Sequence, residues 1–161
     1  MAKRQISKKR IYFRDKQMLQ GILEYKVYRH GKNGEKELVE TFVDKNLIVN
    51  GARNQMARLI GGDIQERYIT KIALGTSNTA PTVDDTQITN AFMKDVTGFA
   101  YPAMGQVTVV WELLTMENNG MAILEFGLVC EDNTLFSRRI RTNPIHKEED
   151  ISIEGLWTII F

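Results

Sequence analysis

The sequence is poor in the features that mark secreted, membrane-bound or catalytic proteins. Its single cysteine, Cys130, cannot form an internal disulfide, which is expected of a protein that assembles in a reducing cytosol. No apolar run approaches the roughly 20 residues of a membrane-spanning helix, and no apolar stretch follows the basic N-terminus. We therefore predict neither a signal peptide nor a membrane partner. The two histidines, His30 and His146, lie far apart and outside any recognised ligand motif, so no enzymatic activity, metal or cofactor is expected.

What the sequence does contain is typical of one globular domain. Its 161 residues are 43% hydrophobic and 25% charged, enough to bury a core without metal or disulfides. The charge is unevenly distributed, because residues 1–10 hold five basic side chains and no acidic one: Lys3, Arg4, Lys8, Lys9 and Arg10. Without these five, 16 of the 21 basic residues remain against 20 acidic ones, a net charge of −4. We predict a basic arm over residues 1–16 and one mildly acidic domain over residues 17–161.

The basic arm has two interpretations that the sequence does not separate. It is either a tether that docks on an acidic surface or on nucleic acid, or a solubilising tail. Arg138, Arg139 and Arg141 are candidates for a larger positive surface. On a strand, however, Arg138 points away from the other two, and the acidic domain further disfavours a nucleic-acid partner.

The first part of the domain is predicted to be a hairpin followed by a helix. Leu23, Tyr25 and Val27 alternate with polar residues, and the turn residues at 30–34 separate two strands within residues 20–43. Over residues 46–60 the apolar spacing becomes helical, with Asp44 or Asn46 as the cap and Gly61-Gly62 as the end. The expected buried stripe of this helix is Ile48, Ala52, Met56, Leu59 and Ile60.

The rest of the chain is predicted to be strands, at residues 68–74, 107–113, 121–130, 135–140 and 151–161. Asn119-Gly120 is expected to join the second and third of these as a hairpin, and a further turn is expected at 131–133. The last strand should bury Ile151, Ile153, Gly155, Trp157, Ile159 and Phe161. We predict a mainly β fold, an antiparallel β-sandwich or barrel-like body with one packed α-helix, comprising the hairpin at about 20–43 and a core at about 44–161.

Weak indications of chemistry do not amount to a site. The Gly75–Pro81 loop lacks the second glycine and the lysine of a phosphate-binding loop. The acidic residues at 84–85 and 148–150 lack the oxygen-ligand spacing of a calcium loop and are best read as solvated turns. Cys130 has no paired base and is predicted to fill the core.

Two stretches resemble the motifs of a family of small tail-associated structural proteins of tailed bacteriophages and prophages. Residues 72–86 read IALGTSNTAPTVDDT and resemble the family signature IAxGTGTTAPxxxDT. Residues 123–147 resemble its E.GLF…LFxR…PIxK region, and residues 150–161 its WxITF ending. The helical segment is also similar to the one that precedes the signature. The resemblance covers about residues 43–161, and it departs from the family pattern at Ser77-Asn78 and Phe126.

The resemblance implies a virion structural protein without catalysis, of the tail fibre, baseplate, collar or minor tail type. Such a protein would be assembled in the cytoplasm of the bacterial host. Its partners would be copies of itself, as a trimer or hexamer rather than a dimer, and neighbouring tail, collar or baseplate proteins. The alternatives are a receptor- or glycan-binding fibre module, with a pocket near Tyr101-Pro102 or the Gly75–Pro81 loop, and a capsid decoration or head-fibre protein.

The candidate interface residues belong to the arm and to the two motifs. The arm contributes its five basic residues, and the first motif contributes Gly75, Thr76, Ala80, Pro81, Asp85 and Thr86. Pro81 stiffens its loop, and Asp85 and Thr86 are suited to fixing a turn. In the second motif, Phe136 beside Arg138 combines an apolar anchor with a directional donor, as interface hot spots often do. Maintenance of the fold is the competing interpretation for each of these motif residues.

Overall fold

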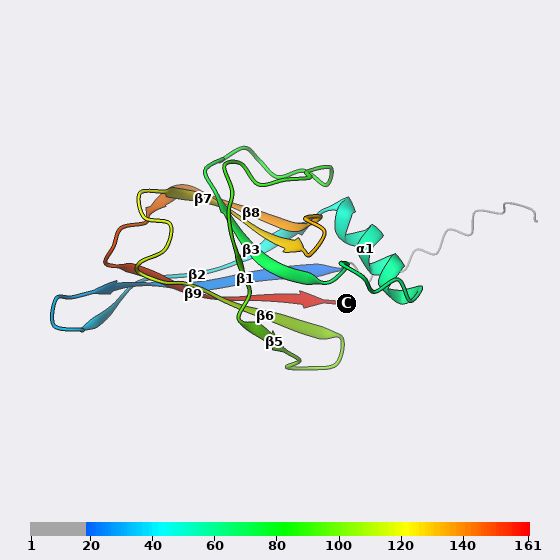
Figure 1. The fold of residues 1–161 in the computed structure, drawn as a ribbon, viewed down its shortest axis with the longest axis horizontal. Coiled ribbons are helices and arrows are strands. Elements are labelled where there is room, and N and C mark those ends of the chain that lie inside the picture. Colours follow the sequence, from blue (N-terminus) through cyan, green and yellow to red (C-terminus); the bar gives the residue numbers. More distant parts are fainter. Residues whose placement is uncertain (1–18) are drawn as a thin grey trace, which may run out of the picture.

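The computed structural model describes residues 19–161, so the predicted basic arm at 1–16 lies outside the described residues. Nine antiparallel strands form one strongly curled sheet, a half-barrel, with one short helix at one end (Figure 1). The elements are β1 Gln20–His30, β2 Lys36–Ile48, α1 Asn50–Ile60, β3 Ile69–Gly75, β4 Phe92–Asp95, β5 Gly98–Ala100, β6 Gln106–Leu113, β7 Ala122–Cys130, β8 Leu135–His146 and β9 Ile151–Ile160. The predicted mainly β fold with one packed helix is confirmed. No helix within residues 19–161 has the length and apolar character needed to cross a membrane.

The order of strands across the sheet is β4-β3-β7-β8-β2-β1-β9-β6-β5. Strand β2 joins the two halves, because most of it pairs with β1 while its last residues, Leu47 and Ile48, pair with β8. The two edge strands, β4 and β5, are consecutive in the chain and separated only by Val96 and Thr97. Three Cα–Cα steps span at most about 11 Å, so the edges approach each other at this point and the sheet must curl.

Strand alternation places the main core on the inner side of this curl. Leu23, Tyr25 and Val27 of β1 are buried as predicted, and so is the β9 series that ends at Trp157 and Ile159. Phe161, predicted to continue that series, lies beyond β9 and is 57% exposed. The reason is that the paired strand stops at Ile160, so the alternation of faces no longer controls its side chain.

An aromatic cluster fills the centre of the core. The Tyr25 ring stacks on Phe42 at 4.7 Å and on Phe126 at 5.0 Å between centroids, and Trp111 lies beside both Tyr25 and Phe126. Glycine is required at position 155, because a Cβ there would lie 2.0 Å from Cε2 of Trp111. These rings therefore join the two halves of the curled sheet through β1, β2, β6 and β7.

The helix begins later than predicted. Residues 44–48 belong to β2, and α1 starts at Asn50 after Val49, which supplies no side-chain cap. The two predicted caps are used elsewhere: Asp44 pairs with Arg139, and Asn46 Oδ1 accepts a hydrogen bond from Trp157 Nε1 at 2.8 Å. The predicted end at Gly61 is confirmed.

The buried face of the helix also differs from the predicted stripe. Ala52 is buried, Met56 and Leu59 are half-buried, and Ile60 is 89% exposed. Gln55, which the apolar pattern excludes, is fully buried and donates through Nε2 to Asp132. This polar contact ties the helix to the β7–β8 turn.

The predicted hairpin around Asn119-Gly120 is wrong. Strand β6 pairs with β5 and β9, whereas β7 pairs with β3 and β8, so residues 114–121 cross between the two halves of the sheet. Asn118 and Gly120 do adopt positive φ, 52° and 92°, but they bend a crossover instead of closing a hairpin. The turn predicted at 131–133 does join neighbouring strands, β7 and β8, with Asn133 at φ 66°.

Candidate functional site

The first motif ends β3 and supplies residues 76–86 of a loop at residues 76–91, which is hydrogen-bonded to strand β7. Glu125 of β7 is fully buried, and its Oε2 accepts hydrogen bonds from the backbone N–H groups of Thr89 at 3.0 Å and Ser77 at 3.3 Å. These two donors belong to opposite ends of the loop. The buried carboxylate of Glu125 therefore holds both ends of the loop together, an arrangement that we call the clamp. Both donors are backbone N–H groups, so the clamp does not depend on which side chains stand at positions 77 and 78.

The second motif completes this clamp through Arg138 of β8. Its Nε donates to Glu125 Oε1 at 2.6 Å, and its Nη1 donates to Asp85 Oδ2 at 2.8 Å. Asp85 in turn accepts from the backbone N–H and the hydroxyl of Thr82, both at 2.9 Å. Partial burial acts to raise the pKa of Asp85, but the hydrogen bonds from Thr82 and Arg138 outweigh it and hold that pKa below its usual value.

Two glycines of the motifs allow the loop to lie this close. A Cβ at Gly75 would lie 2.5 Å from Ile88 Cγ2 and 2.6 Å from Glu125 Oε2, and one at Gly127 would lie 2.7 Å from Ile88 Cδ1. Ile88 is buried with Leu135 in a small second core. The two motifs, residues 72–86 and 123–147, thus meet in one buried network.

Lys147, the lysine of the second motif, is also used inside the chain. It is almost fully buried, and its Nζ donates to Thr115 O at 2.9 Å, Asn119 Oδ1 at 2.6 Å and Glu148 O at 3.0 Å. Burial lowers its pKa. Two of these acceptors belong to the 114–121 crossover, so Lys147 ties that segment to the end of β8.

The predicted interface residues divide into buried and exposed groups. Gly75, Phe136 and Arg138 are buried, and Asp85 and Thr76 are half-buried, with Thr76 Oγ1 accepting from Asn90. In this structure the Phe136–Arg138 pair therefore serves the fold. Ala80, Thr86 and partly Pro81 reach the surface. The arm residues Lys3, Arg4, Lys8, Lys9 and Arg10 lie outside the described residues.

The arginines of β8 do not form a positive patch. Arg138 points to the loop while Arg139 and Arg141 point the other way, as predicted. Each has an acidic partner: Asp85 and Glu125 for Arg138, Asp44 for Arg139, and Glu40 for Arg141.

The two histidines and the cysteine within residues 19–161 lie in strands of the sheet. His30 is the last residue of β1, and His146 is the last residue of β8. His30 Nε2 lies 2.8 Å from Ser152 Oγ. Burial raises the pKa of the Cys130 thiol to about 12, which suits a core residue. No group of three or more His, Cys, Asp or Glu side chains in this part of the chain is placed to hold a metal ion.

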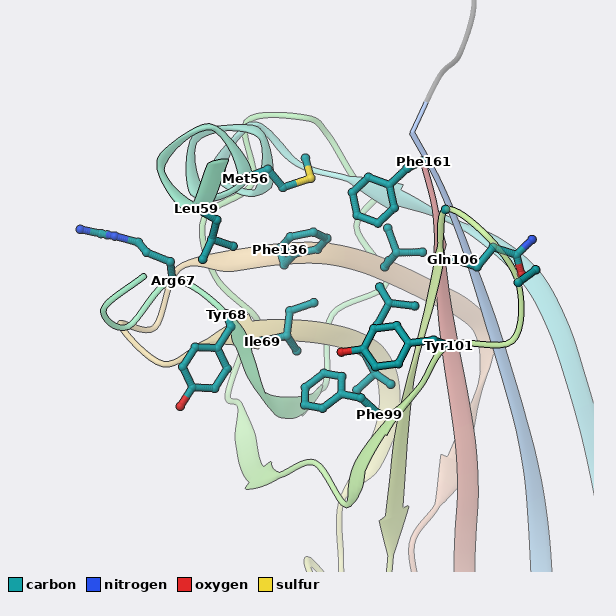
Figure 2. A pocket seen from close by; sticks show the side chains of 15 residues that line it. Met56, Leu59, Arg67, Tyr68, Ile69, Phe99, Tyr101, Gln106, Phe136 and Phe161 are labelled. Atoms are coloured by element: carbon teal, nitrogen blue, oxygen red, sulfur yellow. The ribbon is translucent and has the colours of Figure 1, made fainter. Parts of the chain in front are cut away.

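A hollow of about 560 Å³ lies between α1 and the β5–β6 end of the sheet. In Figure 2, Met56 and Leu59 of α1, Phe136 behind them, Ile69 and Phe99 below, and Phe161 at the side point toward one another. Arg67 and Gln106 point away from it. The lining is therefore almost wholly apolar, which suits an apolar side chain better than a sugar or a charged ligand.

The hollow continues into a shallow strip over α1 and the first residue of the described chain. This strip is lined by Leu19, Arg53, Ala57 and Ile60, and it shares Met56, Leu59 and Phe161 with the hollow. We call the hollow and the strip together the apolar groove. Its rim carries Tyr101, which is 77% exposed, and the neighbouring Met104 is fully exposed. Exposed apolar patches are common at protein interaction sites.

Sequence reasoning found only part of this groove. Tyr101-Pro102 was a candidate for a pocket, and Tyr101 does stand at its rim. The strands β4 and β5 were not predicted, because elements of four and three residues are too short to show a period. A signal was present in the apolar residues Phe99, Tyr101 and Met104, which lie in a segment without strand alternation.

The chain matches no family model, no curated protein and no solved structure. The fold and the geometry above are therefore the basis of any functional argument, together with the motif resemblance.

Proposed function

We propose that this protein is a non-enzymatic structural component of a tailed-bacteriophage virion, of the tail, collar, baseplate or fibre-associated type. The observation that carries the proposal is the meeting of the two motif stretches in one buried network. Glu125 and Arg138 come from the second motif, and Asp85, Ser77 and Gly75 come from the first. A chance likeness in two separate stretches would not be expected to place their polar residues in direct contact.

The surface of the domain supports an assembling protein. The apolar groove, with Tyr101, Met104 and Phe161 exposed around it, leaves apolar area uncovered at one end of the molecule. A stable subunit interface usually covers such area. We therefore propose that the protein assembles with copies of itself, as a trimer or hexamer, and with neighbouring virion proteins, inside the cytoplasm of the bacterial host.

The proposal is tested by locating the protein in particles. Phage or induced prophage particles from the bacterium that encodes the chain should contain it, and antibody labelling seen by electron microscopy should place it on the tail. Absence from purified particles would refute the virion role. Labelling of the capsid would instead favour a decoration or head-fibre protein.

A receptor-binding role is the second candidate, favoured by the exposed aromatic side chains of Tyr68, Phe99 and Tyr101 at the groove. The scarcity of polar groups in the lining argues against a sugar ligand. A glycan array probed with the purified protein decides between the two: specific binding that is lost in Tyr101→Ala would support a fibre module, and no binding by the folded protein supports the structural role.

A further inference from the structure

The apolar groove lies beside the point where the chain outside the described residues begins. Leu19 lines the strip over α1, and the next residue, Gln20, pairs with Ile160, one residue before Phe161. Any chain that precedes Leu19 therefore starts on the groove itself. Six residues span at most about 20 Å, so Phe13 is within reach of the hollow from Leu19.

The order of residues in the arm matches the order of surfaces along the groove. Going back from Leu19, the sequence first presents the apolar segment Ile11-Tyr12-Phe13 and then the basic segment Lys8-Lys9-Arg10. Going away from Leu19, the surface first presents the apolar hollow. At its far side Tyr68 and Phe99 line both the hollow and a neighbouring depression. The charged residues of that depression are Asp95, Glu131 and Lys71.

The two carboxylates at this far end are available to a cationic segment. Asp95 and Glu131 are exposed, and neither forms an ion pair within residues 19–161. The carboxylate of Glu131 lies close enough to Tyr68 to raise the pKa of its hydroxyl. With two carboxylates against Lys71, the far end of the groove keeps a net charge of −1, while the near end is apolar apart from Arg53.

We propose that the Ile11–Phe13 segment of the same chain lies in the apolar groove, with Lys8–Arg10 beside Asp95 and Glu131. The same chain is favoured over a second copy, because Leu19 already holds the segment at the groove and gives it a high effective concentration there. This placement does not depend on the virion role, and each can fail without the other.

Photo-crosslinking tests the placement directly. The full-length chain carries p-benzoylphenylalanine in place of Tyr12 and is irradiated as a mixture of unlabelled and ¹⁵N-labelled protein. We expect crosslinks to peptides with residues 56–60 or 99–105, joining residues of the same isotope label. The matched control carries the same photoreactive residue at Tyr28, near the far end of β1, and should label neither peptide.

Two results would overturn the placement. Crosslinks between differently labelled chains would show that the arm lies on a second copy, and crosslinks absent from both groove peptides would show that it lies elsewhere. The acidic contact has its own test: Asp95→Asn with Glu131→Gln should lower the crosslink yield by at least about twofold at low salt. The double variant Glu148→Gln with Glu149→Gln removes the same charge far from the groove and should leave the yield unchanged. Equal yields in both double variants would refute the acidic contact.

A dye-binding measurement checks that the segment covers apolar surface. Replacing Ile11, Tyr12 and Phe13 by serine should increase the fluorescence of an apolar-surface dye such as anilinonaphthalene sulfonate. The control variant replaces Lys8, Lys9 and Arg10 by serine and should increase it less. Thermal unfolding of each variant shows that the domain is folded in the assay, and unchanged dye fluorescence in the apolar variant would overturn the proposal.

Discussion

Replacing Arg138 by methionine removes the only cation that contacts the fully buried carboxylate of Glu125 within residues 19–161. The methionine keeps much of the apolar stem but leaves Glu125 with two backbone donors and no compensating charge. Breaking a buried charge pair by removing one partner costs about 3–5 kcal/mol. A domain of this size has a total free energy of unfolding of about 5–15 kcal/mol, so a loss near 4 kcal/mol is large.

The assay is urea and thermal unfolding followed by circular dichroism, with the melting temperature expected to fall on the order of 10 °C. Arg139→Met is the matched control: it changes the next residue of the same strand, whose partner Asp44 is half-exposed. An exposed ion pair contributes about 0.5 kcal/mol, so this variant should unfold close to the wild type.

A double-mutant cycle shows whether the buried charge is the cause. In the Glu125→Gln background the carboxylate charge is absent, so Arg138→Met should cost less than in the wild type by about 2 kcal/mol. The clamp is refuted as a stabilising element if Arg138→Met lowers the free energy of unfolding equally in the two backgrounds. It is also refuted if Arg138→Met destabilises the protein no more than Arg139→Met does.

Three further predictions concern single groups. Lys147→Met leaves Thr115 O and Asn119 Oδ1 without their donor. It should lower the free energy of unfolding by about 3 kcal/mol and speed proteolysis within residues 114–121. The control Lys36→Met, at an exposed ion pair, should leave the cleavage pattern unchanged. The pKa of Asp85 is lower in the folded than in the unfolded protein. Its ionised carboxylate therefore adds to the free energy of unfolding in full above the unfolded pKa of about 4, and this stabilisation is lost as the pH falls through the folded pKa. When unfolding at pH 6 is compared with unfolding below about pH 3, Asp85→Asn should lose less stability than the wild type. Cys130 should resist a thiol reagent at about pH 8 in the folded protein and react once denatured, and rapid labelling of the folded protein would contradict its burial.

The sequence was informative wherever one local period controlled the outcome. Leu23, Tyr25 and Val27 repeat every second residue and are buried together, and the β9 series behaves in the same way as far as Ile159. Such strands are predictable because one polar and one apolar face leave a single register.

Prediction failed where a long-range contact decided between local alternatives. Asn46 has the chemistry of a helix cap, but its side chain is taken by Trp157, 111 residues away. Asn119-Gly120 has the chemistry of a hairpin turn, but Lys147 draws residue 119 into a crossover. In both cases the competing partner is far along the chain, and local propensity carries no information about it.

The candidate site was predictable in its residues and not in their arrangement, and strand β8 shows why. In the pairing of β8 with β7, Leu135 lies opposite Val129, and Ser137 lies opposite the adjacent residue, Leu128. Phe136 has no partner on β7 and is the extra residue of a β-bulge. Regular alternation would put Phe136 and Arg138 on one face. With the bulge, Phe136 packs in the main core and lines the apolar groove, while Arg138 reaches Glu125 and the 76–91 loop.

This bulge connects the two features on which the functional argument depends. Leu135 packs on Ile88 of the loop, the carbonyl of Phe136 accepts from Val49 N–H directly before α1, and Arg138 closes the clamp. Residues 135–138 therefore hold the 76–91 loop, contact the chain directly before α1, and place the ring of Phe136 in the lining of the groove. The Phe136–Arg138 pair, whose residue types resemble an interface hot spot, thus acts mainly through the fold. Arg138 holds the 76–91 loop, and the ring of Phe136 packs in the core and borders the groove.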